Sequence, residues 1–324
     1  MLNKKKLEMT FKKYKKNWIE EIESKDSEEE YEEIKNEIDD IIKMNAVEKD
    51  HVLLIDLSSI SSYYLTKWKN EVLINGGNSI DELKKVQMVV FYQCVGQELY
   101  RIRYPNMDLE YDFLEVVTAL IHFTMFGWER EENILFNLIV DNLGKNILDV
   151  DYPQKHIWFL LELYLRYRNR TIAGESQNVH LAVKDKLKKE GRSFELIPED
   201  LDVYKEALDL WLSPNLEEVK SVIDKMILYH SVLVSDIDNE PEFGDYTYGF
   251  YPYEILFLMH IRRKLGLPVP DKFEDLLMNT PEAKVVINEP EPYPEWDPLL
   301  RAIDEFYRKN YPNYIPNKHG KLFE

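Results

Sequence analysis

Residues 79–103 read SIDELKKVQMVVFYQCVGQELYRIR, and they predict one long helix. The first four residues form a capping box, in which Ser79 receives a backbone amide and Glu82 reaches back to the cap. The Gly76-Gly77 pair just before them interrupts the chain. We therefore expect a helix that starts at this box and runs to about Arg103.

Helical spacing of apolar residues continues on both sides of this stretch. Leu7, Phe11, Trp18 and Ile22 mark the first helix of the chain. Tyr31, Ile34, Ile38 and Ile41 mark the second, and a more deeply buried third helix covers 52–72. Ser213-Pro214 is the expected start of a helix to about Val234, with serine as the cap and proline at the first position. The other expected helices cover 109–126, 128–143, 155–169, 177–190, 200–212 and 252–265, the last stopped by Gly266.

Composition supports the same class. The 324 residues include only eleven glycines, and runs of Glu, Lys, Leu and Ile favour helix. We predict an all-α protein with about a dozen helices in an array or bundle and no significant sheet. Residues 1–75 form a charged helical hairpin plus a third helix, and residues 76–324 form the main domain, packed as one unit with the first.

The net charge limits the classes of partner that the protein is expected to bind. A net charge of −19 is repelled by the phosphate backbone, so direct nucleic-acid binding is not expected. The same charge attracts basic proteins. The N-terminus has no apolar stretch of signal-peptide type, and the longest apolar region, 113–128, is too short to span a bilayer. We expect a cytoplasmic protein with no membrane partner.

The cysteine and the histidines give no indication of a catalytic or metal-binding site. The one cysteine, Cys94, most simply fills core space. No histidine has a histidine or carboxylate three or four residues away on the same helical face, so a helical metal site is not expected. We interpret His122, His156, His230 and His260 as hydrogen-bonded core residues, and we predict no cofactor and no catalytic residue.

Two acidic patterns resemble metal sites. Asp236-x-Asp238-x-Glu240 begins like a calcium loop, but Pro241 stands where glycine is required and Thr247 where glutamate is required. Asp275, Glu282 and Lys284 have the spacing of a metal-dependent nuclease, which needs a strand that this sequence does not predict. We therefore expect no resident metal and keep the nuclease as a remote alternative.

Residues 236–253, which we name the acid–aromatic segment, look like a recognition surface. Positions 236–245 carry five carboxylates and no cation, and five of the eight residues 246–253 are aromatic. Carboxylates speed encounter with a basic partner and tyrosines anchor it. The plain alternative is an acidic loop whose tyrosines cover the next helix. The predicted contacts are Asp236, Asp238, Glu240, Glu242, Asp245, Tyr246, Tyr248 and Tyr251.

Three stretches resemble a known family. Residues 92–101, residues 148–160 and residues 249–269, the last ending in Leu-Gly-Leu-Pro-Val, are similar to the helices of immunity proteins of bacterial polymorphic toxin systems, in particular the group numbered forty-nine. The lysine-rich N-terminal hairpin is less like that family, and the run 246–253 is denser in aromatics. A second helical immunity group, directed against nuclease toxins, has a similar plan.

The resemblance implies a non-enzymatic cytoplasmic protein that binds a cognate toxin and blocks it by occlusion. It transfers no catalytic residue. It also suggests that the aromatics from Gly249 onward serve helix packing, so that Phe250 and Tyr253 lie towards the core while residues 236–248 are exposed. A helical scaffold or adaptor that binds another protein is the competing interpretation. The sequence does not set the oligomeric state.

Overall fold

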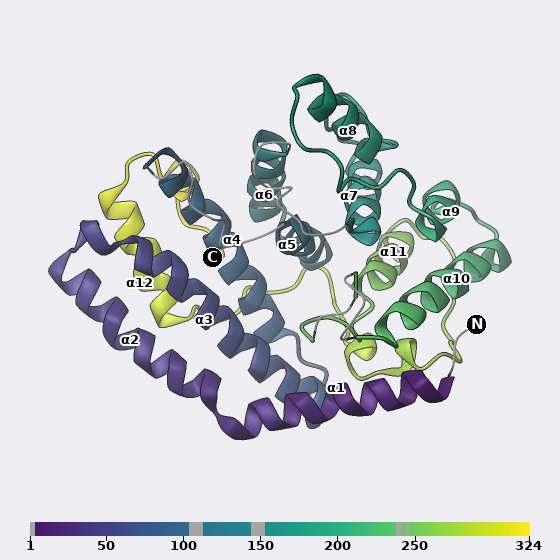
Figure 1. Ribbon diagram of the computed structural model, residues 1–324, viewed down its shortest axis with the longest axis horizontal. Coiled ribbons are helices and arrows are strands. Elements are labelled where there is room, and N and C mark those ends of the chain that lie inside the picture. The colour runs from purple at the N-terminus through teal and green to yellow at the C-terminus, as the bar shows by residue number, and fades with distance from the viewer. Residues whose placement is uncertain (1–3, 104–112, 144–152, 238–241, 244–245) are drawn as a thin grey trace. The chain divides into compact units, whose positions relative to one another are not determined.

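The computed structural model describes residues 4–103, 113–143, 153–237, 242–243 and 246–324. These residues form twelve α-helices and no strand, with one isolated bridge between Ile172 and Glu175 (Figure 1). The predicted all-α class is therefore confirmed. No helix in the described ranges combines the length and apolar character needed to cross a membrane.

The chain divides into two compact units. Unit 1 comprises residues 1–16 and 143–285, and unit 2 comprises residues 17–142 and 286–324. The first helix, α1 (Lys4–Ser24), contributes residues to both. The predicted boundary at residue 75 does not coincide with this division, because each unit joins segments that lie far apart in the sequence and local patterns do not reveal such pairings.

Unit 2 is built around long antiparallel helices and one strongly apolar helix. In α5, every residue from Val116 to Phe126 is buried, which explains why this segment reads as a continuous apolar run. The C-terminal helix α12 contacts α2, α3 and α4. The helices of this unit are α2 (Asp26–Met44), α3 (His51–Lys69) with a π-helical turn at Asn70–Ile74, α4 (Asp81–Arg103), α5 (Phe113–Phe126), α6 (Glu129–Asn142) and α12 (Pro298–Asn310).

Asp297 fixes the start of α12. Its Oδ1 accepts a hydrogen bond from the backbone N–H of Leu300 at 2.8 Å, which caps the helix. Its Oδ2 accepts from the hydroxyls of Tyr31 in α2 and Tyr64 in α3, at 2.5 and 2.6 Å. One buried carboxylate thus ties three helices together.

Unit 1 holds the first half of α1 and five further helices. Asn169 and Gly266 follow α7 and α11 with positive φ angles, as expected for helix ends. Two single 3₁₀ turns, Leu277–Asn279 and Glu282–Lys284, come after α11. The helices are α7 (Lys155–Arg168), α8 (Val179–Lys189), α9 (Val203–Leu210), α10 (Leu216–Val234) and α11 (Tyr253–Lys264).

The structure differs in detail from the sequence prediction at two helix starts, those of α4 and α10. Ser79 Oγ accepts from the N–H of Asp81 at 3.2 Å, and the Glu82 carboxylate lies 3.5 Å from Lys85 Nζ. The cap of α10 is Asn215, whose side chain accepts from Glu217 N–H, so the prediction of Ser213 was wrong by two residues. Ser213 instead accepts from the N–H of Asn215 in the turn before the helix.

Candidate functional site

The acid–aromatic segment lies in unit 1, between α10 and α11. The first half of α1 contacts it. Thr10 Oγ1 donates to the Ser235 carbonyl at 3.0 Å, and Lys6 Nζ lies 3.3 Å from the Asp236 carboxylate. The lysine-rich start of the chain therefore supplies a cation to this segment.

Aromatic rings extend the contact between α1 and the segment. Tyr14 stacks on Tyr246 with centroids 5.9 Å apart and 10° between the planes. Phe11 and Tyr14 each lie 5.0 Å from the ring of Phe250. Such ring pairs add to the burial of apolar area. Tyr246 and Phe250 thus pack against the chain's own N-terminal helix.

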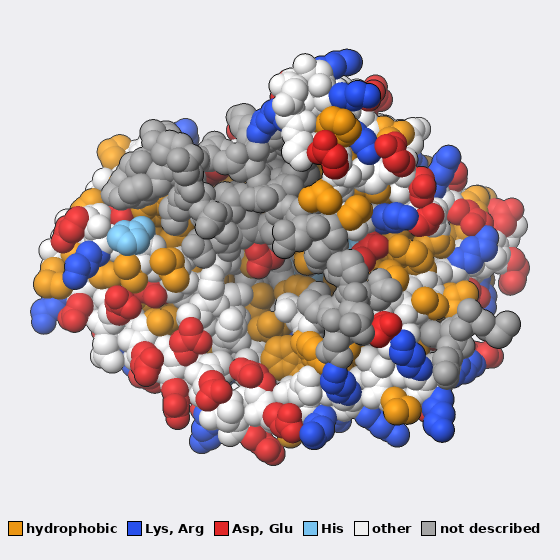
Figure 2. All heavy atoms as spheres, viewed as in Figure 1, with side chains coloured by type: hydrophobic (Ala, Val, Ile, Leu, Met, Phe, Trp, Pro, Cys, Tyr) orange, Lys and Arg blue, Asp and Glu red, His pale blue; other side chains and the backbone are white. Residues whose placement is uncertain are grey.

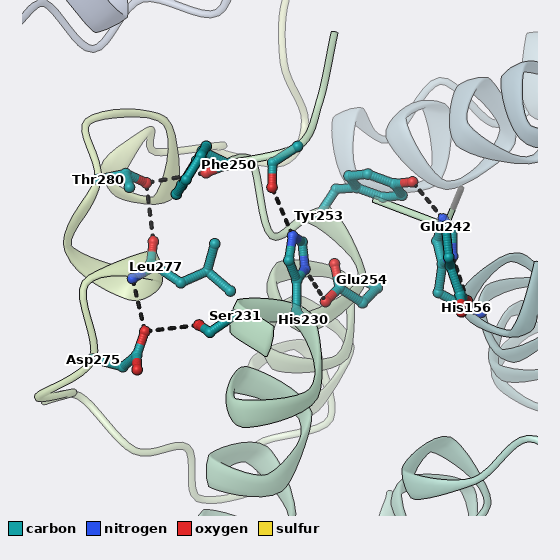
Figure 3. Close-up of polar contacts among 11 residues, drawn as sticks. His156, His230, Ser231, Glu242, Phe250, Tyr253, Glu254, Asp275, Leu277 and Thr280 are labelled. Carbon is teal, nitrogen blue, oxygen red and sulfur yellow. Dashed lines mark hydrogen bonds and ion pairs between the residues drawn. The ribbon is translucent and has the colours of Figure 1, made fainter. Parts of the chain in front are cut away.

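Glu242 is buried and makes three hydrogen bonds, and Figure 3 shows its contact with His156. Its Oε1 accepts from the backbone N–H of His156 at 2.7 Å and from His156 Nδ1 at 2.8 Å, and its Oε2 accepts from the Tyr229 hydroxyl at 2.9 Å. Burial raises the pKa of Glu242, but the hydrogen bonds from His156 outweigh it and leave the pKa below its usual value. The carboxylate is therefore charged and fully engaged inside the unit.

His156 continues this network to α11. Because Nδ1 faces a carboxylate, which only accepts, Nδ1 carries the proton. Nε2 lies 2.7 Å from the Tyr253 hydroxyl and, with the proton on Nδ1, accepts a hydrogen bond from it. The chain Glu242, His156, Tyr253 has the order of a catalytic acid, imidazole and hydroxyl, but Tyr253 is only 2% exposed and the network serves to hold the segment.

His230 in α10 forms a second buried pair. Its Nδ1 lies 2.8 Å from Glu254 Oε1 and its Nε2 lies 2.8 Å from the Gly249 carbonyl (Figure 3). The carbonyl only accepts, so Nε2 donates. The contact with Glu254 then needs a second proton, on either the ring or the carboxyl group. In both cases the pair is neutral overall, which suits its complete burial.

Phe243 links the two pairs. Its ring lies 4.3 Å from that of His156 and 3.7 Å from that of His230, the latter nearly parallel at 16°. Glu242 and Phe243 are consecutive residues of the acid–aromatic segment, so this point of the segment is anchored on both α7 and α10. It is part of the interior of unit 1.

These contacts correct part of the predicted surface. The expectation of exposure was wrong for Glu242 and Tyr248, each 9% exposed, and Tyr251 is fully buried. Asp236 has a side chain 44% exposed, and Tyr246 is half-buried. Asp238, Glu240 and Asp245 lie outside the described residues. The predicted inward positions of Phe250 and Tyr253 are confirmed.

The core interpretation of the histidines is confirmed for three of four. His156 and His230 are buried and hydrogen-bonded. His122 is fully buried, its Nδ1 contacts the Thr118 carbonyl at 2.7 Å, and burial lowers its pKa to about 4. His260 is half-buried. Cys94 is buried, as expected.

The residues of the nuclease pattern serve other contacts. Asp275 Oδ1 accepts from Ser231 Oγ and from the N–H of Leu277, both at 2.9 Å (Figure 3). Glu282 is buried and accepts from the Tyr14 hydroxyl at 2.8 Å, in a 3₁₀ turn rather than the required strand. Lys284 is exposed. Within the described ranges no group of three or more His, Cys, Asp or Glu side chains is placed to hold a metal ion.

An acidic surface that the predicted contacts did not include lies on α2. The inner face of this helix buries Tyr31, Ile34, Ile38 and Ile41, and its outer face is acidic. Figure 2 shows acidic side chains gathered over α2, the helix at the lower left of Figure 1. We name the nine exposed acids the α2 carboxylate row: Asp26, Glu28, Glu29, Glu30, Glu32, Glu33, Glu37, Asp39 and Asp40.

The acidic composition of this region is visible in the sequence. Residues 20–40 hold twelve acids against two lysines. A charged helix face is usually no more than a solvated face, so sequence alone favoured that interpretation. The structure adds that all nine acids within α2 are exposed together on one packed helix.

Comparison with known proteins found no relative. The sequence matches no protein-family model, no curated protein and no solved structure. The resemblance to immunity proteins therefore rests on the quoted sequence stretches.

Proposed function

We propose that this protein is an immunity protein, which binds a basic protein toxin in the cytoplasm of the producing cell and neutralises it by occlusion. The observation that carries the proposal is the α2 carboxylate row. The class of partner, a toxin, comes from the resemblance of residues 92–101, 148–160 and 249–269 to helical immunity proteins. The proposed activity is binding and includes no chemical step.

The α2 carboxylate row has the charge density that attracts a basic protein. Residues 26–40 rise by about 21 Å along the helix, so neighbouring carboxylates lie within the Debye length of about 8 Å at physiological salt. Only Lys35 and Lys43 lie on this helix, and Lys35 Nζ is already 3.1 Å from Glu32. The field of the row is therefore mostly uncompensated and favours fast association with a cationic surface.

The α2 carboxylate row lies on a helix that is held firmly by its packed inner face. Ile34, Ile38 and Ile41 are buried beneath it, and the Tyr31 hydroxyl is bonded to Asp297 at the start of α12. A surface on a packed helix loses little conformational entropy when a partner binds. This rigidity suits a protein that acts by binding tightly and staying bound.

The acid–aromatic segment makes a smaller contribution in this proposal. Asp236 and Tyr246 keep exposed area there, and Asp238, Glu240 and Asp245 add charge in residues outside the described ranges. Glu242, Tyr248 and Tyr251 support the segment from within. The contact prediction for this segment is thus narrowed to the five residues Asp236, Asp238, Glu240, Asp245 and Tyr246.

Growth under toxin expression tests the proposal. The toxin encoded next to this gene is expressed with or without the protein, and the protein is expected to restore growth. The variant Glu29→Lys/Glu33→Lys/Glu37→Lys should restore it poorly. A control, Asp185→Lys/Glu190→Lys, reverses two exposed acids at α8 and should protect like the wild type.

Failure of the wild-type protein to restore growth would remove the immunity function. If the protein then bound a different protein through α2, the adaptor interpretation would replace it. Equal protection by the triple variant and the wild type would remove the α2 carboxylate row from the interface.

A further inference from the structure

Asp56 of α3 is a buried carboxylate without a hydrogen-bond donor. The residue is 5% exposed, and it accepts no hydrogen bond from any residue that the structure describes. Of its two carboxylate oxygens only Oδ2 is fully enclosed, so Oδ1 is open to a group that arrives at the surface. A buried acceptor without a donor lowers stability, and such a group is a candidate for binding.

Two carboxylates of the α2 carboxylate row face Asp56. Ser59, one helical turn after Asp56, donates from Oγ to Glu30 Oε1 at 2.5 Å, which brings Glu30 to the edge of α3. Glu37 follows Glu30 by two turns, about 10.5 Å along α2, and both charges act on Asp56. The two helices pack against each other within unit 2 (Figure 1). We name Asp56, Glu30 and Glu37 the Asp56 cluster.

The Asp56 cluster holds more negative charge than its surroundings compensate. Burial and the charges of Glu37 and Glu30 raise the pKa of Asp56 to about 7. Among the described residues, no charged group of α4 or α12, which also pack on α3, contributes to this shift. Near neutral pH, Asp56 is thus divided between a protonated and a charged form, and a positive charge placed beside it favours the charged form.

A cationic side chain supplies what the Asp56 cluster lacks. An ammonium or a guanidinium has donors and no acceptor, so it satisfies Oδ1 and offsets the charges of Glu30 and Glu37. Ile55, the residue before Asp56, is 48% exposed and offers apolar surface to the aliphatic stem of a lysine or arginine. Within the described ranges no group of carboxylates is placed to hold a metal ion, so a side-chain cation fits better than a bare ion.

We propose that Asp56 receives one lysine or arginine side chain of the basic partner and is the charged contact on which tight binding depends. This inference rests on the proposed function, because it names a contact within the same acidic surface. The exposed acids of the α2 carboxylate row attract the partner, and Asp56 then holds it. A charge pair that is shielded from water affects dissociation more than association, whereas exposed charges set the association rate.

The proposed contact couples binding to the release of a proton from Asp56. With a pKa of about 7, about half of the free molecules carry this proton at pH 7, and the arriving cation displaces it into solvent. The contact is therefore strong at pH 8, where Asp56 is mostly charged, and weakens as the pH falls to 6.

Titration calorimetry of the full chain with the purified toxin encoded next to the gene tests the proposal. Asp56→Asn keeps the shape of the side chain and removes its charge, so we expect it to raise the Kd at least about tenfold at pH 8. At pH 6 the wild type is itself mostly protonated at Asp56, so the ratio of the two Kd values should be several-fold smaller. Because the ratio compares the two proteins at one pH, titrating groups of the toxin cancel.

Proton release is a second readout, which a purely structural role of Asp56 would not change. The titration is repeated at pH 7 in phosphate and in Tris, which differ in their heats of ionisation. The wild type should release about half a proton more than Asp56→Asn on binding the toxin.

Two controls separate the contact from the fold. Thermal unfolding at pH 8 should show Asp56→Asn at least as stable as the wild type, because the variant has no buried charge at this position. Weaker binding by a protein of equal or higher stability is then not a loss of structure. Asp185→Asn removes an exposed charge at α8 and should bind the toxin like the wild type.

Three results would contradict the inference. If Asp56→Asn bound as tightly as the wild type at pH 8 while Glu29→Lys/Glu33→Lys/Glu37→Lys bound weakly, the inference would fail and the proposed function would stand. A ratio of Kd values that is equal at pH 6 and pH 8 would show that the charge of Asp56 makes no contact. Absence of any toxin binding by the wild type would overturn both.

Discussion

Glu242 Oε1 accepts hydrogen bonds from both the backbone N–H of His156, at 2.7 Å, and its Nδ1, at 2.8 Å. His156 is in the first turn of α7, and the preceding Gln154 makes no capping bond with its side chain. Glu242 therefore caps α7 from 86 residues further along the chain, where a negative charge is favoured at a helix N-terminus. An acidic residue expected at the surface is a structural part of unit 1.

Replacing Glu242 by alanine should destabilise unit 1 strongly. The change leaves a buried amide, the imidazole and the Tyr229 hydroxyl without their acceptor, with an expected loss of about 2–4 kcal/mol. Urea unfolding followed by circular dichroism measures it. The control Asp236→Ala removes an exposed ion pair and should cost less than about 1 kcal/mol. Equal losses in the two variants would contradict the capping role.

The stability of unit 1 should depend on pH through Glu242. Because its pKa is lowered in the folded state, the carboxylate stabilises the protein above its unfolded pKa, and this contribution is lost as pH falls through the folded value. The free energy of unfolding of wild type minus that of Glu242→Gln should shrink between about pH 6 and pH 3. A difference that stays constant over this range would show that the charge of Glu242 is unimportant.

The raised pKa of Asp56 implies the opposite pH dependence of stability in unit 2. Burial and the charges of Glu37 and Glu30 raise its pKa to about 7. The folded state then keeps a proton that the unfolded state releases above about pH 4, so the contribution of Asp56 to the stability of the wild type falls as pH rises from 5 to 8. Asp56→Asn should become more stable than wild type over this interval, by thermal unfolding. Parallel curves for the two proteins would contradict the raised pKa, and Asp39→Asn serves as an exposed control.

Asp297 should be central to unit 2. Asp297→Ala removes the cap of α12 and the acceptor of two tyrosine hydroxyls, with an expected loss of about 2–4 kcal/mol. Tyr31→Phe removes one of these bonds and should cost about 1 kcal/mol. Urea unfolding compares the two. A loss in Tyr31→Phe as large as in Asp297→Ala would show that the tyrosine, rather than the carboxylate, holds the helices.

The helices were predictable because their signals are local. Pro252 and Gly266 bracket α11, and the apolar spacing around Trp158 and Leu161 gives α7 almost to the residue. The caps were less certain, since Ser213 and Asn215 are both good capping residues and two positions apart. The division into units was not predictable, because it depends on pairings such as Tyr14 with Glu282 and Tyr31 with Asp297.

The site was predictable in composition but not in exposure. A segment rich in acids and aromatics is visible in the sequence, yet nothing local shows that Glu242 meets His156 or that Tyr251 is enclosed. Spacing along one helix shows no partner for these histidines, whereas the partners of His156 and His230 come from parts of the chain 19 to 97 residues away. Burial depends on how the whole unit packs. Composition alone therefore predicted exposed positions for residues that are buried.

The α2 carboxylate row should set the rate of toxin association. Reversing Glu29, Glu33 and Glu37 to lysine should lower the association rate constant at least about tenfold at low salt, with a smaller change in dissociation. Surface plasmon resonance at several salt concentrations measures both rates. Unchanged association at low salt would show that the partner does not approach α2.

The most direct measurement is the activity of the purified toxin titrated with the purified protein. The account predicts that toxin activity falls in proportion to added protein and is abolished at a one-to-one molar ratio, while the α2 triple variant needs a clear excess. Full toxin activity in the presence of excess wild-type protein would contradict the proposed function.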